Sequence, residues 1–95
     1  MQTIRERLIE SIEWLAEQPA EHFTNEWVLD VEITKNTRGD LLGVVVVTDT
    51  GGPHLQLNTR FNRVEGYWGG EEVTMPINES TCEAVIDFYE EVFEL

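Results

Sequence analysis

The feature that most constrains the fold is a series of short runs between residues 27 and 77 in which apolar and polar residues alternate. Such alternation places apolar side chains on one face of a β-strand and polar side chains on the other. Clusters of Gly, Pro, Asn and Asp separate the runs and favour tight reversals. We therefore expect an antiparallel meander of about five strands, at Trp27–Thr34, Leu41–Thr48, His54–Thr59, Arg63–Trp68 and Glu71–Ile77.

The expected strands differ in pattern. The second contains four consecutive valines, which is typical of an interior strand whose second face is partly covered by a helix or a partner subunit. Pro76 indicates an edge position for the last strand, or its end, because proline cannot donate a hydrogen bond to a neighbouring strand. The first strand alternates most cleanly and should point four side chains inward: Trp27, Leu29, Val31 and Ile33.

The segment between residues 50 and 70 holds five of the seven glycines. We expect Gly51 and Gly52 to form a primed hairpin turn and Pro53 to begin the next strand. Gly66 marks either a bulge or the close approach of a large neighbour such as a Trp. If the strands on either side of Phe61 pair, their shared polar face collects His54, Gln56, Asn58, Arg63, Glu65 and Tyr67.

A helix is expected near the N-terminus. Thr3 and Glu6 have the spacing of a capping box, and Pro19 ends the helix at about Glu17. The connection that follows contains Phe23, which we expect to enter the core. The buried face of this helix comprises Ile4, Leu8, Ile12 and Leu15.

A second helix is expected at the C-terminal end, capped by Asn78 or Ser80. Its apolar face comprises Cys82, Val85, Ile86, Tyr89 and Phe93. The order of elements predicts an α+β fold in a single domain, residues 1–95, with both helices packed on one face of the sheet.

Charge limits the classes of partner. Nineteen acidic residues outnumber six basic ones, for a formal net charge of −13. Such a surface repels nucleic acid and attracts basic proteins, which argues against direct binding to DNA or RNA. No apolar run is long enough to span a membrane and the first residues lack the apolar core of a signal peptide, so we expect a cytoplasmic protein.

No catalytic or metal-binding arrangement is recognisable. Cys82 and Ser80 lie on an expected helix without a nucleophile elbow. His54 beside Glu65 could transfer a proton, although a solvated histidine is the more common role. His22 and His54 occur in unlike contexts, and Cys82 is expected to be a core thiol. We therefore expect a non-enzymatic protein without metal or cofactor.

Carboxylates recur along both expected helices, opposite the apolar faces. Like charges at this spacing cost a helix about 0.2–0.5 kcal/mol per pair, and no lysines are interleaved with them. Their repeat of about 5 to 6 Å is on the scale of phosphate spacing along a nucleic-acid strand. A plain solvated face of an acidic protein would show the same pattern; adaptation to high salt fits less well because Glu outnumbers Asp fifteen to four. These residues, here called the acidic rows, are Glu6, Glu10, Glu13 and Glu17, and Glu83, Asp87, Glu90, Glu91 and Glu94.

The segments Thr50–His54, Asn58–Arg60 and Val64–Gly69, with the motifs TGGP, NTR and VEGYWG, resemble short acidic proteins of bacteriophages and other mobile elements. Those with a known role are mostly inhibitors of host defence, including anti-CRISPR and antirestriction proteins. The resemblance implies this class of biology and supplies no catalytic residues.

Three functional hypotheses follow. The leading one is an inhibitor of a host nucleic-acid-targeting defence system that occupies a basic cleft with the acidic rows, as a nucleic-acid mimic. The second is a small module that binds a peptide or nucleotide on the polar sheet face, through His54, Asn58, Arg60, Tyr67 and Trp68. The third is self-association through the valine-rich strand or the tryptophans, and a homodimer is compatible with either of the others.

Overall fold

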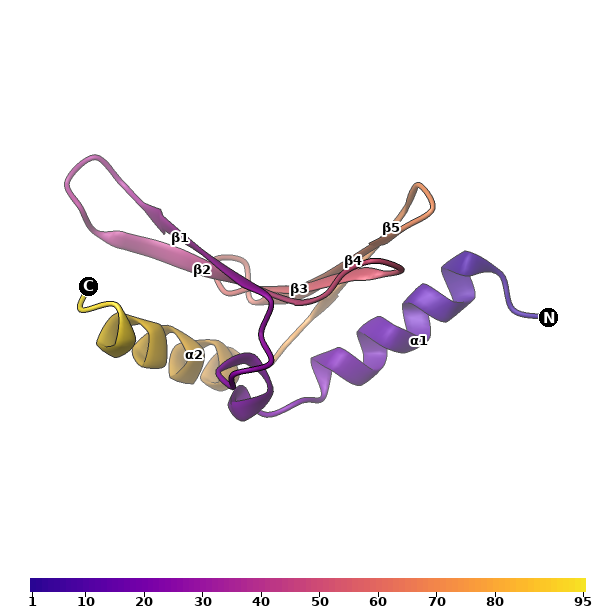
Figure 1. The fold of residues 1–95 in the computed structure, drawn as a ribbon, viewed down its shortest axis with the longest axis horizontal. Coiled ribbons are helices and arrows are strands. Elements are labelled where there is room, and N and C mark those ends of the chain that lie inside the picture. Colours follow the sequence, from indigo (N-terminus) through magenta and orange to yellow (C-terminus); the bar gives the residue numbers. More distant parts are fainter.

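The computed structural model describes all 95 residues and confirms an α+β fold (Figure 1). Five strands form one antiparallel sheet in the order β1-β2-β3-β4-β5, which is the expected meander. A short 3-10 helix, η1, joins helix α1 to the sheet, and helix α2 follows the sheet. The bounds are α1 Ile4–Ala16, η1 Ala20–Phe23, β1 Asp30–Lys35, β2 Leu41–Asp49, β3 His54–Asn58, β4 Arg63–Trp68, β5 Glu71–Pro76 and α2 Glu79–Val92.

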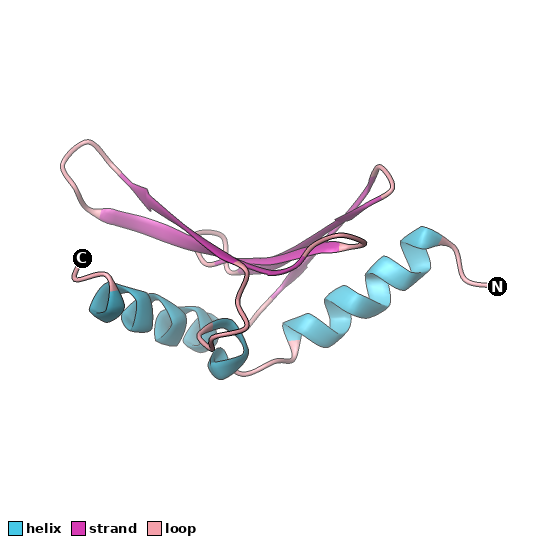
Figure 2. Ribbon diagram, in the orientation of Figure 1, coloured by secondary structure: helices cyan, strands magenta, loops and turns pink.

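Both helices lie on one side of the sheet, as predicted (Figure 2). Helix α1 contacts β4 and β5, whereas α2 contacts β2 and η1. The sheet bends away from the helices at both ends, so its helix-free side, here called the open face, is concave (Figure 1). The molecule measures 48 × 26 × 22 Å along its principal axes. Neither helix is sufficiently long and apolar to cross a membrane.

Helix α1 is fixed at its start and along its buried face. The Thr3 hydroxyl accepts a hydrogen bond from the Glu6 amide at 3.1 Å, which confirms the predicted cap. Leu8, Ile12 and Leu15 are fully buried against the sheet, but the prediction that Ile4 is buried with them is wrong, since Ile4 in the first turn is 44% exposed. Gly66 of β4 lies directly against Ile12 of this face: a Cβ at Gly66 would stand 2.8 Å from Ile12 Cδ1. The close neighbour of Gly66 is thus α1 rather than a Trp, and β4 pairs through this position without a bulge.

Helix α2 is capped by Asn78, whose side chain accepts a hydrogen bond from the Ser80 amide at 2.9 Å. The helix is tied to η1 by the Tyr89 hydroxyl, which donates to the Phe23 carbonyl at 2.6 Å. Phe23 is fully buried, as expected. Phe93 follows the end of the helix and stacks on Tyr89, but it remains half-exposed rather than buried.

The prediction that β1 begins at Trp27 and buries Trp27 and Leu29 is wrong. The strand begins at Asp30, and the exposed fractions of Trp27 and Leu29 are 79% and 57%. The side chain of Asn25 accepts a hydrogen bond from the Trp27 amide at 2.8 Å and forms a turn before the strand. This turn lifts Trp27 away from the core despite the alternating pattern.

Two expectations about β2 also need correction. The strand is interior, as expected, but the expected helix does not cover its open face, where Val47 is buried between its register neighbours Asp30 and Gln56. Cover by a partner subunit, the other alternative, stays a prediction. The loop after β2 has four residues, and only Gly51 has a positive φ, of 85°. A two-residue primed turn is therefore not formed.

Candidate functional surfaces

The acidic rows lie on the outer side of the helix layer. In α1 they are opposite the fully buried Leu8, Ile12 and Leu15, and in α2 opposite the buried Cys82, Val85 and Tyr89. The two helices follow one another along the long axis of the molecule, below the sheet in Figure 1. Eight of the nine side chains are exposed and Glu90 is half-buried. Glu94 follows the end of α2 rather than lying on it.

No arginine or lysine neutralises the acidic rows. The salt bridges of the molecule join Arg5 to Glu71, Arg38 to Asp40 and Arg63 to Glu65, all outside the rows. Within the rows, Glu6 accepts a hydrogen bond from the Thr3 hydroxyl and Glu10 accepts one from the Gln2 amide. Their negative charge is therefore free to act on a partner.

The positions of several row residues oppose helix stability. A helix C-terminus carries partial negative charge, so a carboxylate there is unfavourable by about 0.3–1 kcal/mol. Glu17 caps the C-terminus of α1, and Glu90 and Glu91 stand in the last turn of α2. Neither helix has a basic residue in its last turn. The carboxylates at these three positions therefore do not stabilise the helices that carry them.

The open face carries a hydrogen-bonded polar network across β3 and β4. The register pairs His54 with Tyr67, Gln56 with Glu65 and Asn58 with Arg63, so these six residues share one face, as predicted. His54 Nε2 lies 2.8 Å from Gln56 Oε1, and Gln56 Nε2 donates to Glu65 at 2.7 Å. Partial burial, followed in size by the charges of Glu65 and Glu72, raises the pKa of Tyr67.

Glu65 is the centre of this network. It is only 3% exposed, although it points to the helix-free side of the sheet. Arg63 Nε donates to it at 2.6 Å, and the Asn58 amide is a weaker contact at 3.4 Å. A buried carboxylate is stable only with such partners. The network therefore fixes the centre of the open face rather than leaving it loosely solvated.

Two arginines flank an exposed ring beside this network. The Arg63 and Arg60 guanidinium carbons lie 5.1 and 5.7 Å from the centre of the Phe61 ring, within cation–π range. Phe61 is 58% exposed, and Arg60 forms no salt bridge. Gly43 makes room for Arg60, since a Cβ there would lie 2.7 Å from the Arg60 Cβ. From its place in the chain, Phe61 was expected only as a turn residue.

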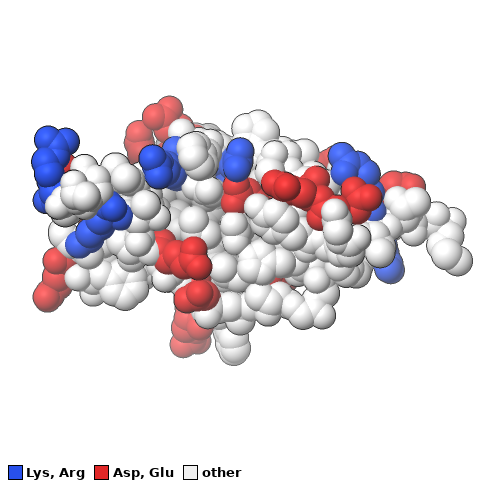
Figure 3. Space-filling view, turned by 90° about the horizontal axis from the view of Figure 1, so that it is seen from above, with Lys and Arg blue, Asp and Glu red and all other residues white.

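The structure brings together only part of the predicted ligand face. His54, Asn58 and Tyr67 share the open face with Arg60 at its edge, but Trp68 lies on the helix side, where it packs on the core beneath Arg7. Viewed onto the open face, acidic and basic groups are interspersed (Figure 3). This surface is mixed in charge, in contrast to the acidic rows.

The remaining reactive groups are not assembled into a site. Burial, with a smaller contribution from Glu79, raises the pKa of Cys82 to about 11, as suits a core thiol. No three His, Cys, Asp or Glu side chains are grouped to hold a metal ion. Comparison with models of protein families, with curated proteins and with solved structures gave no match.

Proposed function

We propose that this protein is a non-enzymatic inhibitor that docks its acidic rows into a basic, nucleic-acid-binding cleft of another protein. The observation that carries the proposal is the absence of any ion pair along nine carboxylates on one side of the molecule. A cationic cleft would supply the charges that the chain itself does not, and the match would steer association.

The cost of these charges to the fold supports the same conclusion. Adjacent carboxylates repel one another by about 0.2–0.5 kcal/mol per pair, and those at helix C-termini oppose the helix dipole. Residues kept at a cost in stability are typical of functional surfaces. The resemblance to phage-encoded proteins supports a nucleic-acid-targeting defence complex of a bacterial host as the class of target, and under this proposal the protein acts in the host cytoplasm.

The test uses three baits at low salt in a bacterial lysate, followed by DNA-cleavage assays on the captured nuclease. The row variant is Glu13→Gln/Glu17→Gln/Asp87→Asn, whose side chains are exposed and make no hydrogen bond in the native protein. The matched control is Asp30→Asn/Glu32→Gln/Glu72→Gln, which removes the same charge from exposed positions on the open side. The native chain is the third bait.

We expect the native chain and the control to capture a nucleic-acid-binding protein and to inhibit it in competition with DNA. Between 50 and 200 mM salt the affinity should fall at least about tenfold, because the contact is ionic and partly exposed. The row variant should lose capture while its melting temperature stays level or rises, since repulsion is relieved. Equal capture and inhibition by the row variant would refute the proposal.

A second candidate is supported by Arg60, Phe61 and Arg63. A cationic pair around an exposed ring suits an anionic ligand with an aromatic group, such as a nucleotide or a phosphorylated tyrosine peptide. Titration with a nucleotide should perturb NMR signals of the Arg60 and Phe61 amides, and Arg60→Ala should abolish the effect while row variants leave it unchanged. Unchanged binding by Arg60→Ala would refute this candidate.

A further inference from the structure

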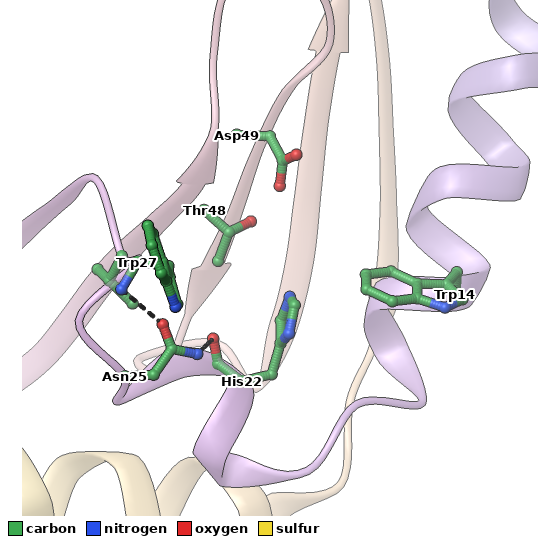
Figure 4. A pocket seen from close by; sticks show the side chains of 7 residues that line it. Trp14, His22, Asn25, Trp27, Thr48 and Asp49 are labelled. Atoms are coloured by element: carbon green, nitrogen blue, oxygen red, sulfur yellow. Dashed lines mark hydrogen bonds between the residues drawn. The ribbon is translucent and has the colours of Figure 1, made fainter.

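A hollow of about 180 Å³ opens where the end of α1 meets η1 and the end of β2 (Figure 4). Trp14 and Trp27 stand on opposite sides of it, with His22 between them and Asp49 at its far end (Figure 4). It lies apart from the network of the open face. No site was expected here from the sequence, because the lining residues come from four separate segments.

Neighbouring groups hold the backbone at Trp27 and the ring of Trp14. Asn25 accepts from the Trp27 backbone amide at 2.8 Å and donates to the His22 backbone carbonyl at 3.1 Å, so one side chain fixes the backbone of both residues. The His22 ring meets the Trp14 ring edge-on, with centroids 5.1 Å apart. The backbone around the hollow and its Trp14 wall are therefore ordered before a ligand arrives, which lowers the entropy lost on binding.

The charge of the lining is negative and uncompensated. No Lys or Arg lines the hollow, and Asp49 forms no salt bridge. The β2–β3 pairing is irregular between Val47 and Asp49, at the end of β2 that carries Asp49. A second hollow shares Trp14 and Asp49 and adds Glu10 of the acidic rows. Indole faces and an unpaired carboxylate together attract a cation.

We propose that this hollow receives an arginine side chain of the basic partner that docks on the acidic rows. Its volume is below the roughly 300–1,000 Å³ of pockets for drug-sized molecules, so a single side chain is a suitable occupant. A guanidinium group stacks on indole rings and pairs with a carboxylate in a fork, which an ammonium group does less well. The assignment of the arginine to that partner rests on the proposed function, whereas the binding of an arginine side chain in the hollow is tested without the partner.

The test titrates the chain with the blocked pentapeptide acetyl-Gly-Gly-Arg-Gly-Gly-amide and follows the three indole N–H signals by NMR. Otherwise identical peptides carry citrulline, which has the same shape without the charge, or lysine. We expect millimolar binding that shifts the Trp14 and Trp27 signals and leaves Trp68 unchanged. Citrulline should bind at least tenfold more weakly, and lysine at least twofold more weakly.

Variants locate the site. Trp27→Ala and Asp49→Asn change exposed residues and should each weaken arginine binding at least fivefold, whereas Asp30→Asn, an exposed aspartate on the open side, should not. Thermal melting of each variant checks that the fold is kept. Equal binding of citrulline, equal shifts at Trp68, or no shift at Trp14 and Trp27 would overturn the proposal. If the peptide does not bind but the row variant still loses its partner, the arginine site is refuted and the proposed function stands. If the peptide binds but the row variant keeps its partner, the proposed function alone is refuted.

Discussion

Replacing Gly66 by alanine tests the contact that seats α1 on the sheet. The added Cβ would lie 2.8 and 2.9 Å from Ile12 Cδ1 and Cγ1, and 2.9 Å from Leu8 Cδ1. Carbon atoms in ordinary contact are about 3.5–4.0 Å apart, so each distance is too short by roughly 0.6–1.2 Å. Leu8 and Ile12 are fully buried and cannot turn aside into solvent. Gly66→Ala must therefore displace α1 or force strained rotamers.

The expected cost is that of overpacking a core, about 1–3 kcal/mol. In a domain of this size 1 kcal/mol lowers the melting temperature by about 4–8 °C. We expect Gly66→Ala to melt at least about 4 °C below the native chain when unfolding is followed by circular dichroism. Because α1 carries Trp14 and one acidic row, the displacement should also weaken binding of the arginine peptide.

A matched control separates packing from the general effect of removing a glycine. Gly52 has no positive φ, and a Cβ there would meet nothing within 4 Å. Gly52→Ala should be neutral or stabilise the protein by up to about 1 kcal/mol, because it restricts the unfolded chain. A melting temperature for Gly66→Ala equal to that of Gly52→Ala would refute the packing argument.

A double-mutant cycle tests which atoms carry the cost. Ile12→Ala alone should destabilise the protein by about 2–5 kcal/mol through the cavity that it creates. The double variant Ile12→Ala/Gly66→Ala should cost at least about 1 kcal/mol less than the sum of the two single changes, since the new methyl group occupies part of that cavity. Strict additivity of the two changes would show that Ile12 is not the obstacle.

Two further predictions concern buried ionisable groups. Burial raises the pKa of Cys82 to about 11, whereas an unfolded thiol has a pKa near 9. Between pH 9 and 11 the unfolded chain therefore loses this proton while the folded chain keeps it, and the free energy of unfolding should fall by roughly 2 to 3 kcal/mol from its value below pH 9. Urea unfolding measured across this pH range should show this fall, and Cys82→Ala should make the fall smaller. Rapid modification of the Cys82 thiol in the native protein at pH 8 would contradict the prediction. Arg63→Ala should lower the free energy of unfolding by about 1–3 kcal/mol because it leaves Glu65 buried without its cation. Glu65→Gln should cost less because the Arg63 side chain, 40% exposed, can reach water; equal costs would contradict this account of the network.

Much of the fold was predictable because its signals are local. Alternation located the strands, and turn residues between them set the order of the meander. Helical spacing placed the acidic rows opposite the buried faces, and the Thr3 cap needed only residues one turn away. The shared polar face of β3 and β4 followed from the strand pattern and the turn at Phe61.

The errors arose where distant residues decide the outcome. Trp27 and Leu29 alternate as a strand would, but the Asn25 side chain and the end of β2 set the path of the chain there. Glu65 was expected on a solvent-exposed face, but its three hydrogen-bond partners on β3 and β4 enclose it. The hollow beside Trp14 was not predicted, since nothing in the sequence relates Asp49 to an indole on α1.

By itself, the sequence determined the α+β class, the meander and the faces of both helices, because each depends on periodicity within a few residues. The tertiary structure decided that the acidic rows remain unpaired, that Glu65 is enclosed, and that two tryptophans and Asp49 surround a hollow. These features depend on which segments meet in space and on how closely they pack. Burial and charge pairing are properties of such contacts, and a linear pattern does not encode them.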